Sequence, residues 1–170
     1  MRSAVTAAPS REDRRVYLIE GEMRIEVNQL PPAECSPNAR IHWSERYQAA
    51  EIYQGAVFYE CVDARNRLER LPWRPGFPPF QKPRVNLTFV FPNYRKRDED
   101  NLRARFKPGL DAMVQARLIE DDSIDSLDLG EITVEVDKER APLTIIDIEE
   151  MKLKGESDGT GKSSENSKRD

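Results

Sequence analysis

Two pairs of acidic residues are the part of this sequence best suited to chemistry. Asp98 and Asp100 stand two residues apart. Asp121 and Asp122 follow 21 residues after Asp100, and Lys107 lies between the two pairs. Carboxylates gathered in one place repel each other unless a hard divalent cation neutralises them, and Mg²⁺ binds a few carboxylates while keeping waters for a phosphate substrate. If the segment between them folds back, these residues predict a Mg²⁺ site beside a phosphate-binding lysine.

Simpler roles remain open for both pairs. Asp98 and Asp100 suit the N-cap and first turn of a helix, where the helix dipole favours acids. Asp121 and Asp122 suit a solvated turn. A calcium loop is excluded, because Arg103 stands where such a loop needs glycine.

Nucleophilic and zinc chemistry are poorly supported by the residues present. His42 is the only histidine, and Ser44 is better placed as a helix cap than in a catalytic triad. Cys35 and Cys61 are far apart in the sequence, so one histidine and two cysteines form no recognisable zinc site.

The net charge of −4 hides two blocks of opposite charge. Residues 65–97 hold nine basic residues against one acid, and residues 119–150 hold twelve acids against two basic residues. The basic block suits the phosphates of nucleic acid, with the alternative that both blocks are solvated faces that partly pair. Trp43 suits either a DNA contact or the core. The candidate DNA contacts are Arg95, Lys96, Arg97, Arg84, Lys82, Arg40, His42 and Trp43.

Apolar periodicity predicts the strands that position these residues. Alternation predicts four strands, at residues 23–27, 85–91, 124–136 and 143–151. With the predicted helices the order is strand, helix, strand, helix, strand, strand, which is typical of an α+β domain.

Two helical segments are predicted. A long helix is capped by Ser44 and runs to residue 71, and the proline-rich run 72–83 connects it to the next strand. A second helical segment follows Asp100, and Pro108 either kinks it or begins a further helix. The apolar stripe of the long helix is Tyr47, Ala50, Val57, Cys61, Ala64, Leu68 and Leu71, with Gln54 in its one gap.

The length of 170 residues suits one domain. We expect a disordered arm at residues 1–20, the domain at residues 21–153 and a disordered polar tail at residues 154–170. Because no apolar run approaches the length of a membrane span and the two cysteines are far apart, we expect a cytoplasmic protein that has no membrane partner.

The block from Arg97 to Ser123 resembles the RusA family of Holliday junction resolvases. Its matching residues are Arg97-Asp98-Glu99-Asp100-Asn101-Leu102, then Lys107, then Asp111-Ala112-Met113, then Glu120-Asp121-Asp122-Ser123. Upstream residues are similar to the N-terminal segment of the phage and prophage branch, at Leu30-Pro31-Pro32, Ser36-Pro37-Asn38 and Arg40-Ile41-His42-Trp43.

The resemblance implies a small α+β homodimer with a mixed sheet and two main helices. In this family such a dimer, with Mg²⁺ or Mn²⁺ and no nucleotide cofactor, cuts four-way DNA junctions by paired nicks. The residues that match the essential metal-site acids are Asp98, Asp100 and Asp122, Lys107 matches the essential lysine, and Asp121 is a further candidate ligand.

The chain departs from the family pattern in three places. The interval from Asp100 to Lys107 is longer than in the best-known form, Arg117 stands where a glycine is common, and Glu99 adds a charge. Two other functions therefore stay open beside the resolvase: a junction-binding protein whose nuclease site has decayed, and a broader structure-specific nuclease acting on flaps or replication intermediates.

Overall fold

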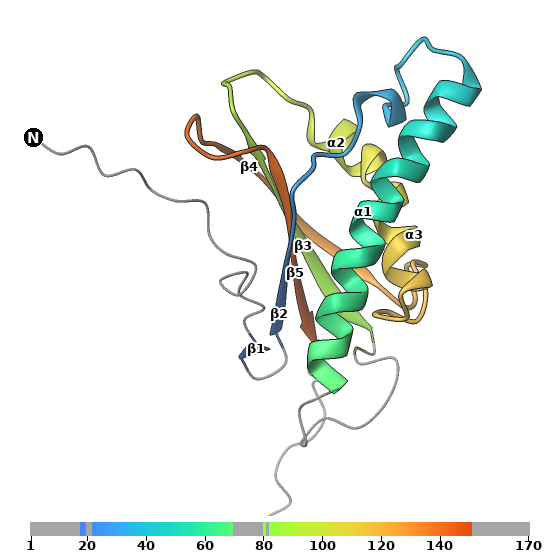
Figure 1. Ribbon diagram of the computed structural model, residues 1–170, viewed down its shortest axis with the longest axis vertical. Coiled ribbons are helices and arrows are strands. Elements are labelled where there is room, and N and C mark those ends of the chain that lie inside the picture. The colour runs from blue at the N-terminus through green and yellow to red at the C-terminus, as the bar shows by residue number, and fades with distance from the viewer. Residues whose placement is uncertain (1–17, 20–21, 70–79, 81, 151–170) are drawn as a thin grey trace, which may run out of the picture.

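The computed structural model describes residues 18–19, 22–69, 80 and 82–150 (Figure 1). In chain order the elements are β1 (Leu18–Ile19), β2 (Glu22–Val27), the 3-10 turn η2 (Ala33–Cys35), α1 (Trp43–Glu69), β3 (Pro83–Phe91), α2 (Glu99–Arg105), α3 (Lys107–Gln115), β4 (Asp128–Val136) and β5 (Leu143–Glu150). The predicted α+β class is confirmed. Among the described residues, no helix is both long and apolar enough to cross a bilayer.

The strands form one mixed sheet in the order β1-β2-β5-β3-β4. The pairs β1–β2, β2–β5 and β5–β3 are antiparallel, whereas β3 and β4 are parallel. A parallel pair needs a crossover that carries the chain back along the sheet. The segment from α2 to α3 supplies that crossover, so the order of the strands determines where the candidate acids lie.

One hydrophobic core joins the helices to one face of the sheet. Figure 1 shows α1 and α3 side by side against that face, and α1 contacts both α3 and β2. Alternate residues of β3 point into the core, including Val85, Leu87 and Phe89, which are fully buried. The alternation that predicted this strand therefore follows from packing of one face against the helices, while Val90, on the other face, is buried in a small separate cluster with Leu143 and Ile145.

The long helix is confirmed, but its start and part of its apolar stripe were predicted wrongly. It begins at Trp43, so Ser44 is not its cap. The ring nitrogen Nδ1 of His42 takes that place, accepting from the backbone N–H of Ser44 at 3.3 Å and lying 2.7 Å from its Oγ. Tyr47 is exposed, and Tyr53 rather than Gln54 fills the gap in the stripe.

Tyr53 fits the core because its hydroxyl group has a partner. It lies 3.0 Å from Oγ1 of the buried Thr144, whose own hydroxyl donates to the carbonyl of Gln29 at 2.7 Å. A buried hydroxyl without a partner costs free energy, so this chain of hydrogen bonds allows a tyrosine where an aliphatic side chain would be expected. Burial raises the pKa of Tyr53 above its ordinary value.

Phe106 separates the second helical segment into α2 and α3. Pro108 lies in the first turn of α3, where its missing N–H costs nothing, so the alternative in which the proline begins a further helix is the correct one. Phe106 is fully buried, and its ring lies 6.1 Å from that of Phe89 and 6.3 Å from that of Tyr53, measured between centroids.

Some predictions fall outside the described residues. The polar tail at 154–170 and most of the arm at 1–20 lie there, although Leu18–Ile19, within that expected arm, form β1. The proline-rich connector also lies mostly there; within it, Phe80 is buried and bridges to Ile119. The strand predicted from residue 124 begins at Asp128.

Candidate functional site

Asp98 and Asp100 lie at the start of α2, where the chain arrives from β3. Asp98 is the N-cap of the helix, and its Oδ1 accepts from the backbone N–H of Asp100 at 3.2 Å. The capping role left open from the sequence is therefore present. Capping uses one carboxylate oxygen of Asp98, and the side chains of Asp98 and Asp100 are both exposed to solvent.

The loop that precedes these acids is shaped by Arg97. Its guanidinium donates to the carbonyls of Asn93 and Arg95 and to Oδ1 of Asn93, and it lies 3.6 Å from the ring centroid of Phe91. Arg97 thus holds the loop, whereas Arg95 and Lys96 are exposed and available to an anion. Burial lowers the pKa of Arg97, although an arginine stays protonated at neutral pH.

The upstream motifs are tied to α2 by hydrogen bonds. The side-chain N–H of Asn101 donates to Oγ of Ser36 at 2.8 Å. Arg105 donates to the carbonyl of Pro32 at 3.0 Å and also to that of Pro31. Asn101 and Arg105 are positioning residues that sequence reasoning missed, since hydrogen bonds between distant segments leave no periodic signal.

Trp43 is exposed by 71%, so of its two predicted roles the core anchor is wrong. It stands at the start of α1 with its ring 5.6 Å from that of His42, and Arg40 close by in the chain is also exposed. The 3-10 turn η2, in the segment that leads to α1, contacts α2. Figure 1 shows η2 and α2 at the same end of the molecule. Aromatic and basic side chains therefore gather at the end where Asp98 lies.

Lys107 joins two carboxylates at the start of α3. Its Nζ lies 2.8 Å from Oδ1 of Asp111, one helical turn away, and also pairs with Oδ2 of Asp122 across 15 residues. Burial lowers the pKa of Lys107, but the hydrogen bonds that its ammonium group donates to the two carboxylates outweigh this effect and raise the pKa above its ordinary value. Two predicted catalytic residues, Lys107 and Asp122, are thus in contact. Lys107 and Asp111 are four residues apart, a spacing at which opposite charges pair on one face of a helix, so the sequence could have predicted this contact.

Asp121 shapes the turn that presents Asp122. Its Oδ1 accepts from the backbone N–H of Asp122 at 2.9 Å. Hydrogen bonds from the side chain of Ser123 and then from the backbone lower the pKa of Asp121. Asp121 therefore supports its neighbour and is charged at neutral pH.

The turn after α3 favours glycine at position 117, because the backbone is left-handed there. Arg117 has a φ of 57°, in the left-handed region, and comes two residues after the last residue of α3. A left-handed residue at this position is typical of a Schellman cap. In that cap the N–H of Arg117 donates to Val114 and the N–H of Leu118 donates to Met113. A residue with a β-carbon is strained in this conformation.

Replacing Arg117 by glycine should stabilise the fold by about 1 kcal/mol, because the left-handed strain is removed and the arginine side chain is exposed. Urea unfolding followed by circular dichroism measures the change. Arg117→Ala keeps a β-carbon and is the control, for which no gain is expected. An equal gain from both variants would contradict the strain at this turn.

The described residues contain no group of three or more histidine, cysteine, aspartate or glutamate side chains placed to hold a metal ion. The expected convergence of the carboxylates is therefore not present within one chain. Asp98 caps the start of α2, whereas Asp122 is paired with Lys107 at the start of α3. The carboxylates have the right donor chemistry for Mg²⁺, but their grouping does not fit a site built by one copy.

The predicted basic block is divided between the two ends of β3. Arg95, Lys96 and Arg97 follow its last residue, whereas Lys82 and Arg84 stand at its start, about 30 Å away along a nine-residue strand. Nε of Arg84 lies 2.7 Å from Asp128 on β4. A single phosphate-binding surface from all these residues is therefore not formed, and the cations nearest Asp98 are Arg95 to Arg97.

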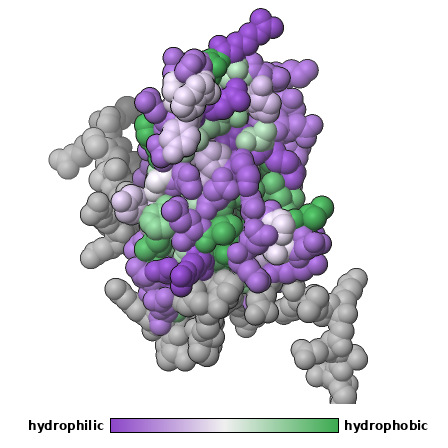
Figure 2. Space-filling model, turned by 90° about the vertical axis from the view of Figure 1, so that its right-hand side faces the viewer, coloured by the Kyte–Doolittle hydropathy of each residue, from purple (hydrophilic) through white to green (hydrophobic). Residues whose placement is uncertain are grey.

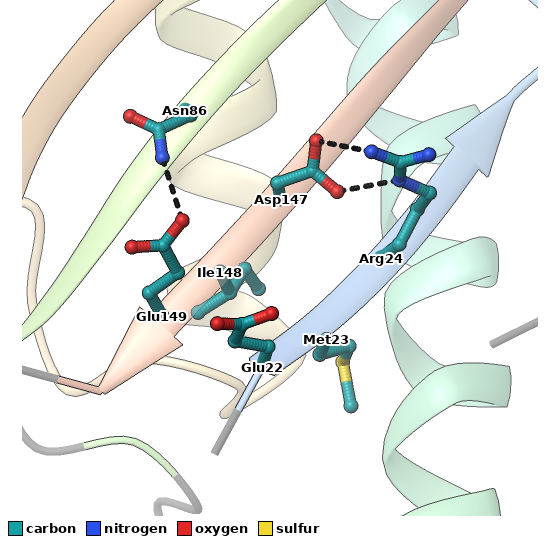
Figure 3. Close-up of a pocket in the computed structure, with 7 residues that line it drawn as sticks. All are labelled: Glu22, Met23, Arg24, Asn86, Asp147, Ile148 and Glu149. Carbon is teal, nitrogen blue, oxygen red and sulfur yellow. Dashed lines mark hydrogen bonds and ion pairs between the residues drawn. The ribbon is translucent and has the colours of Figure 1, made fainter. Parts of the chain in front are cut away.

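A hollow of about 320 Å³ lies on the sheet face away from the core (Figure 3). Arg24 and Asp147 are paired across it at 2.6 Å, and Asn86 donates to Glu149 at 3.1 Å. None of the predicted site residues lines this hollow.

Comparison with known proteins gives one partial match. No known protein-family profile matches the chain. A protein of Xylella fastidiosa described as an uncharacterized protein is 37% identical over 93 residues, which are 54% of this chain and 56% of that protein. The chain thus spans little more than half the length of this relative, whose description carries no function.

Proposed function

We propose that the protein is a Mg²⁺-dependent endonuclease of the RusA type that cuts branched DNA, with four-way junctions as the preferred substrate and a homodimer as the active form. The observation that carries the proposal is the contact between Lys107 and Asp122, which are 15 residues apart in sequence. Both belong to the ordered set of residues that resembles the family.

The side chains around this contact suit a phosphate diester. Lys107 keeps its charge at neutral pH and lies at the start of α3, where the helix dipole also favours an anion. A scissile phosphate held there would exchange for one of the two carboxylates that now neutralise the lysine. Asp122 would then be free to accept a proton from the attacking water or to bind the cation.

Asp98, Asp100 and Asp122 have the donor chemistry of Mg²⁺ ligands, with Mn²⁺ able to substitute, but one copy does not bring all three into one site. When bound, the cation would supply Lewis-acid stabilisation of charge on the phosphate. Hydrolysis adds one water across the bond between phosphorus and the 3′ oxygen, which leaves with a proton. Two symmetric nicks need two copies, because one site cannot reach both strands at once.

The surface around α2 suits a backbone contact with DNA. Arg95 and Lys96 are exposed beside Asp98, and Trp43 and Arg40 lie at the same end of the molecule. Basic side chains bind phosphates, while an exposed aromatic ring can stack on a base that has left the duplex. Base pairs at the crossover of branched DNA stack on fewer neighbours than those of a linear duplex and unpair more easily, which favours a branched substrate over linear duplex.

The direct test incubates the purified full-length protein with a synthetic four-way junction, a flap and a linear duplex, each with Mg²⁺ and with EDTA. We expect paired nicks in the junction that require Mg²⁺, with little cutting of linear duplex. Equal cutting of flap and junction would favour the broader nuclease. Junction binding without cutting in Mg²⁺ or Mn²⁺ would favour the decayed binding protein and exclude the proposed enzyme.

A further inference from the structure

Two aromatic side chains stand on one exposed ridge at the start of α1. Trp43 is 71% exposed and Tyr47 is 57% exposed. They are four residues apart, and residues at this spacing are neighbours on one side of a helix. Figure 2 looks onto the helical side of the molecule and shows pale patches of intermediate hydropathy near the end at which α1 begins in Figure 1. The described part of the chain covers neither ring, so packing of the core does not account for them.

Both rings are held in place by neighbouring side chains. The hydroxyl group of Tyr47 donates to Oε1 of Glu51 at 2.8 Å, so this side chain is fixed to the helix at both ends. The ring of Trp43 lies 5.6 Å from that of His42, which is itself held by the N–H of Ser44. A ring that is already fixed loses little conformational freedom when a flat partner binds to it. The ridge is thus arranged for stacking before any ligand arrives.

The spacing of the two rings selects an unpaired strand. Four residues of helix rise about 6 Å, whereas successive bases of a duplex strand are about 3.4 Å apart. Inside a duplex, both faces of a base are also covered by its neighbours. A strand that has left the duplex can stretch until two successive bases match the two rings, and stacking on aromatic side chains tolerates any base. A single strand therefore fits the ridge better than a duplex.

Two basic side chains flank the ridge. Arg40 is exposed just before it, and Arg46 is exposed on the first turns of α1. Nη2 of Arg46 donates to the carbonyl of Ala39 at 3.1 Å, so the guanidinium is held beside the start of the helix. Such groups bind the phosphates of a strand whose bases stack on neighbouring rings. Two glutamates of the same segment balance the two arginines in charge, so stacking must supply most of the binding.

Hydrogen bonds connect the ridge to the candidate site. Ser36, in the segment that leads to α1, accepts from the side chain of Asn101 on α2 at 2.8 Å. Arg105 of the same helix donates to the carbonyl of Pro32 at 3.0 Å. Because Asp98 caps the start of α2, a strand on the ridge would lie at the end of the molecule that carries this acid.

We infer that Trp43 and Tyr47 form a stacking site for an unpaired DNA strand, in which each ring takes one of two successive bases and Arg40 and Arg46 contact the phosphates. At a branch point, such a site holds the strand that leaves the duplex. The choice of DNA rests on the proposed function, whereas the stacking requires neither cutting nor a metal ion. Tyr47, which periodicity placed in the core, thus helps to determine which strand is bound.

Fluorescence anisotropy of a labelled thymidine oligonucleotide tests the site, with the full-length protein in EDTA so that nothing is cut. Trp43→Ala and Tyr47→Ala should each weaken binding by about 5-fold to 150-fold, the effect of losing one stacked base. Tyr47→Phe keeps the ring and should bind like wild type. Tyr59→Ala is the control, because Tyr59 is 74% exposed on the same helix, about three turns away, and its loss should leave binding unchanged. All four replaced side chains are exposed, so circular dichroism should show folded variants.

The fluorescence of Trp43 reports stacking directly. The sequence contains one other tryptophan, and Trp73→Phe leaves Trp43 as the single emitter. We expect the oligonucleotide to quench this emission and a duplex of the same length to quench it less. Since two phosphate contacts predict a weak salt dependence for a single strand, the affinity should fall by only about sevenfold between 50 and 200 mM salt.

Equal binding by wild type, Trp43→Ala and Tyr47→Ala would overturn the stacking site, as would equal quenching by duplex and single strand. Tighter binding of a uridine oligoribonucleotide than of the thymidine oligonucleotide would overturn the choice of DNA. Binding that depends on both rings, without cutting of any branched DNA, would refute the nuclease alone. Cutting of a junction by a protein that does not bind the single strand would refute the stacking site alone.

Discussion

Asp122→Asn should slow the cutting of a four-way junction by roughly 100-fold to 10 000-fold, the range for loss of a group that moves a proton in the transition state. The amide cannot accept the proton and is a poor Mg²⁺ ligand. It also removes the pairing with Lys107. That pair is partly exposed, so the loss should cost the fold no more than about 1 kcal/mol.

Single-turnover rates in Mg²⁺ measure this effect, with protein in excess over junction. The control is Asp125→Asn, which removes the same charge from an exposed position three residues away. We expect the control to cut at the wild-type rate. Equal cutting rates for Asp122→Asn and wild type would show that the contact between Lys107 and Asp122 takes no part in catalysis.

Phe106→Ala should lower the free energy of unfolding by about 3 to 5 kcal/mol, the usual cost of removing a buried phenylalanine. The ring fills the space between α2, α3 and the sheet. It lies against the rings of Phe89 and Tyr53, and it is so close to Gly109 that a β-carbon there would fall 2.5 Å from it. No neighbour is placed to fill the cavity without moving a helix.

Urea unfolding at equilibrium measures this loss. Tyr94→Ala is the control, since Tyr94 lies on the exposed loop before α2 and its removal should change the free energy by less than about 0.5 kcal/mol. A change for Phe106→Ala below 1 kcal/mol would mean that α2 and α3 do not depend on this ring for their packing.

The strands and the long helix could be predicted because burial on one face leaves a period in the sequence. Met23, Ile25 and Val27 alternate into the core on β2, as do the apolar residues of β3. Periodicity gave the wrong burial at two positions of α1, since Tyr47 was predicted to be buried and is exposed, and Tyr53 was left out of the stripe and is buried. Periodicity cannot show that Thr144, 91 residues away, offers Tyr53 a hydrogen bond, or that the side chain of Tyr47 is exposed.

The candidate site was predictable only in part, because its residues depend on the direction of the strands. The sequence places Asp98 after one strand and Asp122 before another. Convergence of these acids assumed that the helical segment returns the chain to its starting point. Since β3 and β4 are parallel, that segment instead carries the chain from the end of β3 to the start of β4. Lys107, midway along it, reaches Asp122, while Asp98 stays behind.

The acids of β4 have a consequence for the whole sheet. Among the described residues β4 is an outer strand that pairs with β3 alone, so a row of backbone N–H and C=O groups along Asp128–Val136 faces away from the described sheet. Such an edge can recruit further strands and start aggregation. Glu131 and Glu135 are exposed on it, and a second β4 aligned antiparallel about Thr133 would bring these two like charges together. Part of the acidic block thus protects the edge, which keeps the sheet from growing by addition of another copy.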